Sequence, residues 1–258
     1  MRFVPFVAVI AALISITATP AQAITNGSPD GNGHPEAGAL IDGRAYPDGT
    51  WSYCTGTLIS PTVFLTAAHC GRPKQKTAMV SFAGQYRLGE NVHIGRYVPD
   101  PRYTSRSDVH DIAVVVFNTA IPNIKPARLP AAGMLDNLVA DGSLKATTFT
   151  PVGYGALGPT RGPHGRKFHY TDTRRWASMS FHKLTGTWLE LSKNAAKGDG
   201  STCYGDSGGP NFLGGPTSDL LAATTISGDD AACRATNLDY RLDTAVARNF
   251  LGRFVTLP

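Results

Sequence analysis

The chain has 258 residues, of which 42% are hydrophobic and 17% are charged, and its formal net charge is +5. This length suits one large all-β domain or two small domains that share a cleft. The composition supplies enough apolar residues for a core and excludes an intrinsically disordered chain. The positive charge is mild, and we expect no nucleic-acid partner.

Residues 1–23 follow the order of a secretory signal peptide. Arg2 precedes an apolar run from Phe3 to Ile16, and the small-residue end Ala21-Gln22-Ala23 follows. A membrane-spanning helix needs about 20 apolar residues, so an uncleaved anchor is the weaker alternative. We therefore expect a secreted, extracellular protein with no membrane anchor after signal cleavage.

Short runs rich in Val, Ile, Thr and Phe come next, with glycine and proline between them. Such runs predict an all-β fold. The proline-rich stretch 122–143 suits a connection between two β-rich halves. The strand-like runs cover residues 56–68, 77–84, 111–117, 147–155 and 220–226.

A basic segment, residues 160–176, follows the fourth of these runs and reads TRGPHGRKFHYTDTRRW. Its glycines and prolines indicate an exposed loop, so a solvated face is the default interpretation, and polyanion binding is the alternative. At the end of the chain, 243–254 is expected to be helical. Asp243 or Thr244 would cap this helix. Its apolar face would consist of Val246, Phe250 and Leu251.

The stretch STCYGDSGGPNF, residues 201–212, places Ser207 in the loose G-x-S-x-G pattern of hydrolase nucleophiles. A serine hydroxyl needs a neighbouring base, and histidine is the usual one. All the histidines precede Ser207, which excludes the α/β-hydrolase order with its histidine last. They are His34, His69, His93, His110, His164, His169 and His182.

The remaining order, His…Asp…Ser, points to two places. One is His69 in LTAAHC, and the other is Asp111 at the start of an apolar strand. Asp108 is the alternative acid, and we prefer Asp111 because the strand follows it directly. The cysteines are even in number, which predicts two disulfides in an exported chain. They allow three pairings, and no C-x-x-C spacing among them supports a zinc site; they are Cys54, Cys70, Cys203 and Cys233.

Three ordered motifs, TAAHC at 66–70, DIAVV at 111–115 and GDSGGP at 205–210, resemble the trypsin/chymotrypsin family of serine proteases. ITNG at 24–27 and GYG at 153–155 are also similar to landmarks of that family. The resemblance implies two six-stranded antiparallel barrels packed around a cleft, followed by a C-terminal helix. The barrels would cover about 24–125 and 140–240, and the helix about 243–254.

The resemblance also implies a role for each site residue. His69 would be the general base and then the acid, Asp111 would orient it, and Ser207 would attack the substrate carbonyl. The backbone N–H groups of Gly205 and Ser207 would form the oxyanion hole. The same resemblance pairs the cysteines as Cys54–Cys70 and Cys203–Cys233.

Asp206 would be buried beside the nucleophile and would need a cation. In relatives this cation is the ammonium of a freshly cut N-terminal Ile or Val, and cleavage after Ala23 would expose Ile24. We therefore expect an Ile24–Asp206 ion pair created by signal removal.

Matching positions with the family implies a primary substrate pocket with Ser201 at its base, Gly228 at its entrance and Leu238 on its far wall. An uncharged base favours apolar or small substrate side chains. A register shift of one residue would instead bring in Asp239 and a preference for basic side chains. Asp229 and Asp230 near the rim would act in the same direction.

We expect a secreted serine endopeptidase that acts on protein or peptide substrates as a monomer, with no cofactor and no metal. Two alternatives stay open. One is a catalytically idle relative that acts as a binding protein, and the other is a secreted esterase with the same triad.

Overall fold

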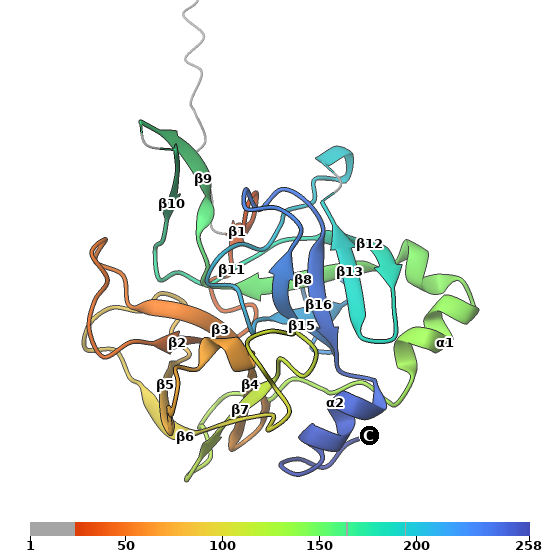
Figure 1. The fold of residues 1–258 in the computed structure, drawn as a ribbon, viewed down its shortest axis with the longest axis horizontal. Helices are drawn as coiled ribbons and strands as arrows, with labels where there is room; N and C mark the ends of the chain where they lie inside the picture. The colour runs from red at the N-terminus through yellow and green to blue at the C-terminus, as the bar shows by residue number, and fades with distance from the viewer. Residues whose placement is uncertain (1–23, 164, 194) are drawn as a thin grey trace, which may run out of the picture.

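The computed structural model describes residues 24–163, 165–193 and 195–258, so the expected signal peptide lies outside the described residues. Two closed six-stranded antiparallel barrels lie side by side, as expected from the sequence (Figure 1). The first barrel has the strand order β2-β3-β4-β7-β6-β5. Its strands are β2 (Ala37–Ile41), β3 (Ser52–Ser60), β4 (Val63–Thr66), β5 (Thr77–Ser81), β6 (His93–Pro99) and β7 (Ala113–Phe117).

The second barrel follows the order β8-β12-β13-β16-β15-β14, and the pairing of β14 with β8 closes it. Its strands are β8 (Thr148–Gly153), β12 (Met179–Leu184), β13 (Trp188–Ser192), β14 (Pro210–Leu213), β15 (Leu221–Gly228) and β16 (Asn237–Arg241). Outside the barrels lie β1 (Ser28–Pro29), β9 (Leu157–Gly162), β10 (Gly165–His169), β11 (Arg175–Trp176), α1 (Met134–Ala140) and α2 (Ala245–Leu251). Three 3₁₀ turns are η1 (Ala68–Cys70), η2 (Ser143–Ala146) and η3 (Ala195–Lys197).

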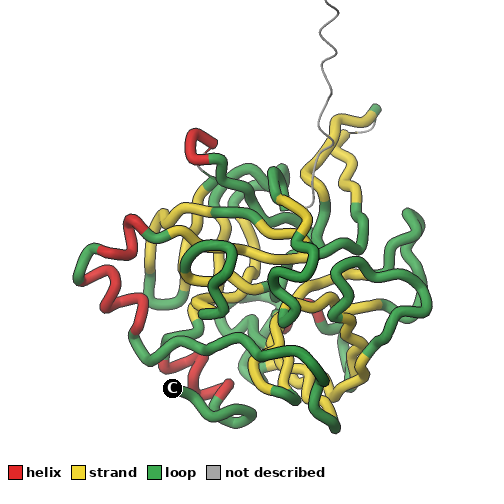
Figure 2. The backbone as a smooth tube through the Cα atoms, turned by 180° about the vertical axis from the view of Figure 1, so that it is seen from behind, coloured by secondary structure: helices red, strands yellow, loops and turns green. Residues whose placement is uncertain are grey.

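Loops and turns run between these elements over much of the surface (Figure 2). Among the residues that the structure describes, no helix combines the length and apolar content needed to cross a membrane.

The first described residues pair with the second barrel, although the sequence boundaries grouped them with the first. β1 pairs with β11, and Thr25 bridges Ser201. These contacts bring the N-terminal segment beneath the loop that carries Ser207, so the segment belongs to the surroundings of the site.

A buried ion pair also fixes this segment to the first barrel. The fully buried Arg174 donates from Nε to Asp30 at 2.7 Å, and from Nη1 to the carbonyls of Ala37 and Phe82 at 3.0 and 3.1 Å. Burial by itself would raise the pKa of Asp30, but hydrogen bonds from His34 and the charge of Arg174 lower it to about 2. The Asp30 carboxyl is therefore ionised and paired in the interior.

Helix α2 begins one residue after Thr244, whose hydroxyl caps it by accepting from the Ala247 amide at 3.3 Å. Phe250 and Leu251 are buried on its apolar face, as expected. The prediction for Val246 is wrong. This side chain is 39% exposed, and Ala247 is buried in its place, because adjacent helical residues point about 100° apart.

Candidate active site

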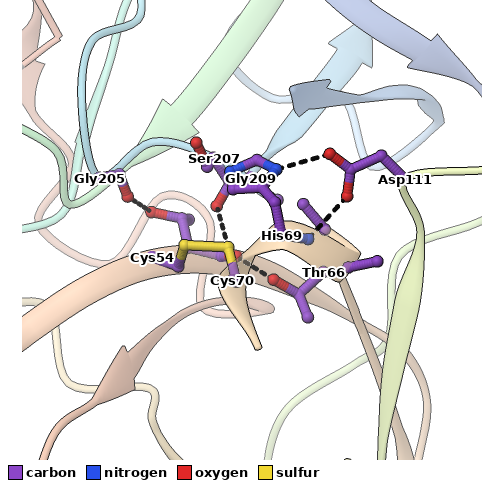
Figure 3. Close-up of a disulfide and its surroundings, with 12 residues drawn as sticks. Cys54, Thr66, His69, Cys70, Asp111, Gly205, Ser207 and Gly209 are labelled. Atoms are coloured by element: carbon purple, nitrogen blue, oxygen red, sulfur yellow. Dashed lines mark hydrogen bonds and ion pairs between the residues drawn. A yellow bond between two sulfur atoms is a disulfide. The ribbon is translucent and has the colours of Figure 1, made fainter. Parts of the chain in front are cut away.

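His69 and Asp111 meet because of the pairing between two strands of the first barrel. Strand β4 leads into the η1 turn that carries His69, and β7 starts just after Asp111. Thr66 pairs with Ala113, so the end of β4 lies beside the start of β7. Asp111 Oδ2 lies 2.6 Å from His69 Nδ1, and Asp111 Oδ1 accepts from the His69 amide at 2.8 Å (Figure 3).

The Asp111 carboxylate is buried, whereas Asp108 is exposed. The two contacts fix both the ring and the backbone of His69 relative to one carboxylate. The arrangement favours the tautomer with a proton on Nδ1 and leaves Nε2 free to accept a proton.

Ser207 comes from the second barrel, but its loop is held by the first. Thr55 in β3 donates its amide to the Ser207 carbonyl at 2.9 Å and its hydroxyl to the Gly205 carbonyl at 2.8 Å. Figure 3 shows Ser207 beside the imidazole of His69, on the side away from Asp111. Across the described residues, no hydrogen bond joins the Ser207 hydroxyl to the ring. Such contacts are often long before substrate binds.

Two backbone amides in the Ser207 loop have no internal partner. Asp206 and Gly209 donate to carbonyls within the loop, but Gly205 and Ser207 donate to nothing in the part of the chain described. Gly205 has φ +94°, a conformation that favours glycine, and a Cβ there would lie 2.9 Å from the Gly155 Cα. The loop thus presents two free N–H groups where Ser207 would attack a carbonyl.

Asp206 belongs to the same loop, and it is buried, with 1% of the residue exposed. Its Oδ1 accepts from the Gly155 amide and its Oδ2 from the Cys203 amide, both at 2.8 Å. Burial raises the pKa of Asp206 to about 7, and these two hydrogen bonds only partly oppose the rise. A Cβ on Gly155 would lie 2.6 Å from the Asp206 Cγ, which explains the glycine after Tyr154.

Ile24 is fully buried, and the next residue, Thr25, exchanges two backbone hydrogen bonds with Ser201, at 2.8 and 3.0 Å. The Thr25 hydroxyl is buried and has no partner among the described residues. With Ala23 before it in the chain, the Ile24 nitrogen is a peptide amide. The contacts of the described residues include no pairing between it and Asp206.

The first of two cavities beside Ser207 has a volume of about 520 Å³, and Ser201 and Gly228 are among the residues that line it. Ser201 is fully buried, and its hydroxyl lies 3.3 Å from Asn237 Oδ1. Asp229 and Asp230 lie on the exposed part of the wall. This cavity can accept a substrate side chain on a polar but uncharged base.

Leu238 does not line this cavity, contrary to expectation, and Asn237 takes its place. Side chains alternate along β16, so Asn237 and Asp239 share one face and Leu238 points away. A bulge in β15 between Thr225 and Ser227 sets this register. Asp239 does not line the cavity either: it is fully buried and accepts from Asn211 Nδ2 at 2.9 Å. The sequence reasoning did not identify Asn237. Its position two residues before Asp239 was a usable signal, because side chains two positions apart on a strand lie on the same face.

The second cavity, of about 600 Å³, lies on the other side of Ser207 and His69. The Cys54–Cys70 disulfide forms part of its wall. Exposed Asp48 is at its edge, and aromatic side chains supply much of its lining: Tyr46, Tyr53, Tyr170 and Tyr204. The sequence reasoning did not identify these tyrosines: Tyr53 belongs to β3, and the other three lie in separate loops.

Both disulfides have the pairing that the resemblance implies. Cys54–Cys70 ties β3 to the His69 turn, and Cys203–Cys233 ties the Ser207 loop to the wall of the first cavity. The possible metal ligands of three residues lie close together, those of Cys54, Cys70 and His69. The two sulfur atoms form a disulfide, however, so neither can act as a thiolate ligand.

Comparisons with known proteins agree with this geometry. The family model for Trypsin matches residues 39–249. The chain is 27% identical over 195 residues to Serine protease 56 of Mus musculus, covering 67% of this chain and only 31% of that protein. It is 24% identical over 205 residues to the Venom serine protease of Polistes dominula, covering 70% of this chain and 68% of the relative. In fold it is similar to the solved structure of HL collagenase, with a TM-score of 0.65, 22% identity and coverage of 88% and 96% of the two chains.

Proposed function

Because this chain belongs to the trypsin family of serine proteases, we propose that it is a secreted serine endopeptidase that cleaves protein or peptide substrates through an acyl-enzyme. The observation that carries the proposal is the 2.6 Å contact between His69 Nδ1 and Asp111, with Ser207 beside the same ring. Family membership alone would also fit a relative that has lost activity. The intact constellation favours an enzyme over a binding protein.

In the first half of the reaction, the Ser207 hydroxyl attacks the substrate carbonyl carbon while His69 Nε2 takes its proton. The carbonyl oxygen becomes an oxyanion, which the free amides of Gly205 and Ser207 stabilise. Asp111 stays ionised and stabilises the imidazolium. His69 then gives its proton to the leaving nitrogen, the C–N bond breaks, and the acyl group remains on Ser207.

In the second half, water takes the place of the serine hydroxyl. His69 Nε2 removes a proton from the water as its oxygen attacks the acyl carbonyl, and the same two amides bind the new oxyanion. Collapse of this intermediate breaks the bond to Ser207 Oγ, which recovers its proton from His69. The product acid leaves, and the site returns to its starting state.

Signal removal is the proposed activation step. Cleavage after Ala23 would give Ile24 a free ammonium, and this residue is already buried next to a loop whose Asp206 has no cationic partner among the described residues. An ammonium close to Asp206 would offset the cost of burying its carboxylate. The paired loop would then hold Gly205 and Ser207 in the conformation that binds the oxyanion.

The neutral base of the first cavity supports a preference for apolar or small residues before the scissile bond. Ser201 and Asn237 offer hydroxyl and amide groups but no carboxylate at the base. Asp229 and Asp230 lie nearer solvent, where water weakens their attraction for a basic side chain.

The test compares wild type with Ser207→Ala on casein and on a panel of short peptides. We expect kcat to fall by at least about 10⁴-fold. Ser105→Ala, a change at an exposed serine, is the matched control and should keep full activity. A serine-directed phosphonate should label wild type and the control but not Ser207→Ala. Absence of labelling would favour the binding-protein alternative, and labelling with ester but no casein hydrolysis would favour the esterase.

A further inference from the structure

The hairpin formed by β9 and β10 projects away from the two barrels as a separate two-stranded sheet (Figure 1). Arg161 and Arg166 lie directly opposite each other across its strands, and Lys167 is paired with Thr160. Paired residues of an antiparallel sheet share a face, so the two guanidinium groups lie on one face and the lysine on the other. All three cations are exposed.

These cations have no acidic partner in the part of the chain that the structure describes. The ion pairs of the described residues include none that involves Arg161, Arg166 or Lys167. Like charges directly opposite each other destabilise a sheet. The hairpin therefore has an unfavourable internal arrangement that a bound anion would relieve.

The base of the hairpin forms part of the active-site rim. Phe168 in β10 packs edge-on against Tyr204, with ring centroids 4.9 Å apart, and Tyr204 lines both cavities. Tyr170, just after β10, lines the second cavity. An extended strand rises about 3.4 Å per residue, so Lys167 and Arg166 lie roughly 10 and 14 Å along the chain from Tyr170.

A substrate would reach the hairpin with the part that follows the scissile bond. The first cavity holds the neutral Ser201 base for the side chain before that bond, so the leaving segment runs over Tyr170 in the second cavity. The exposed Asp48 carboxylate at this cavity disfavours acidic residues immediately after the bond. Anionic residues a few positions further on would meet the basic hairpin.

We propose that the β9–β10 hairpin is an exosite for acidic segments of protein substrates, located about three to six residues after the scissile bond. This inference rests on the proposed endopeptidase function, because it assigns a substrate class to the same site. A peptide fits better than a large polyanion, since the exposed cations are confined to one narrow hairpin in line with the second cavity.

The test uses two quenched peptides that are identical up to the second residue after the scissile bond. One continues with four glutamates and the other with four glutamines. We expect kcat/KM to be roughly 3- to 30-fold higher for the glutamate peptide at low salt, the range of two or three exposed charge pairs. The preference should disappear at about 1 M salt, where the Debye length falls to about 3 Å.

The variant Arg161→Gln/Arg166→Gln should lose most of this preference and keep its activity on the glutamine peptide. Arg96→Gln/Lys145→Gln removes the same charge from exposed positions on β6 and η2 and should keep the preference. A wild-type ratio near 1 would overturn the proposal, as would equal losses in both variants. Binding of a sulfated polysaccharide through the hairpin, without any preference for the glutamate peptide, would also overturn it.

A binding measurement tests the exosite independently of the proposed endopeptidase activity. If neither peptide is cleaved and casein is not hydrolysed either, endopeptidase activity is refuted, and the exosite is then measured by fluorescence anisotropy of the glutamate segment on Ser207→Ala. We expect several-fold weaker binding when Arg161 and Arg166 are also replaced. Equal affinity with and without these arginines would refute the exosite alone.

Discussion

Removal of residues 1–23 should largely abolish the pH dependence of stability that Asp206 imposes. With residues 1–23 still attached, the pKa of this carboxyl is raised from 3.8 to about 7. A rise of about three units, at about 1.4 kcal/mol each, corresponds to about 4 kcal/mol. Because the folded pKa is the higher one, this stability is fully present below pH 3.8 and is lost as the pH rises to about 7.

A free ammonium on Ile24 would remove this loss by stabilising the ionised carboxylate. The free amine titrates at about 7.7–8, and pairing raises its pKa, so the benefit should persist through neutral pH and fade in alkaline solution. Activity of the processed chain should fall over the same alkaline range, because the Ser207 loop depends on the pair.

Urea unfolding between about pH 4 and 8 measures the effect, with Ser207→Ala in every chain to prevent self-digestion. The chains to compare begin at Ile24 or at Ala23, each with and without Asp206→Asn. For the chain that begins at Ala23, the effect of Asp206→Asn on the free energy of unfolding should change by about 4 kcal/mol over this range. For the chain that begins at Ile24 it should change much less. Superimposable profiles for the two starting points would refute the reasoning.

Three further predictions concern buried polar groups. Arg174→Met should lower the free energy of unfolding by about 3–5 kcal/mol, since it removes the guanidinium from the buried Asp30 carboxyl and leaves only the hydrogen bonds from His34, and a loss below about 1 kcal/mol in urea unfolding would contradict this. Burial raises the pKa of Asp239 well above 3.8, so the free energy of unfolding should decline as the pH rises above about 4. Asp239→Asn should flatten that decline. If the free energy of unfolding of this variant depends on pH as steeply as that of wild type, the carboxyl is not protonated in the folded protein. Ser201→Asp should raise kcat/KM for arginine or lysine before the scissile bond by about 10- to 150-fold relative to leucine, the value of one charged hydrogen bond. Cleavage of a peptide panel that varies this residue measures the ratio, and an unchanged ratio would contradict the prediction.

The sequence located the residues around the candidate site because each lies at the end of a strand or in a short ordered motif. Asp111 opens β7 and His69 closes the turn after β4, so strand pairing alone brings them together. Cysteine parity predicted two disulfides, and the pairing came from the family resemblance. These features depend on local pattern and on a fold that the motifs identify.

The residues that line the wall of the first cavity could not be predicted from the sequence in this way. A single bulge between Thr225 and Ser227 decides whether Asn237 or Leu238 faces the cavity, and no residue in that stretch marks the bulge. The role of Arg174 was equally hidden. Its sequence neighbours suggested a solvated basic loop, whereas its partner Asp30 lies 144 positions away in the chain.

The hydrogen bonds from Thr55 to the Ser207 loop have a consequence for biosynthesis. A growing chain that has completed only its first barrel already contains the base and its acid, but the alcohol they serve has not yet been made. When that alcohol arrives, its loop still needs a donor from the earlier half to take its final shape. The proposed cleaving activity therefore requires that both halves have folded and joined.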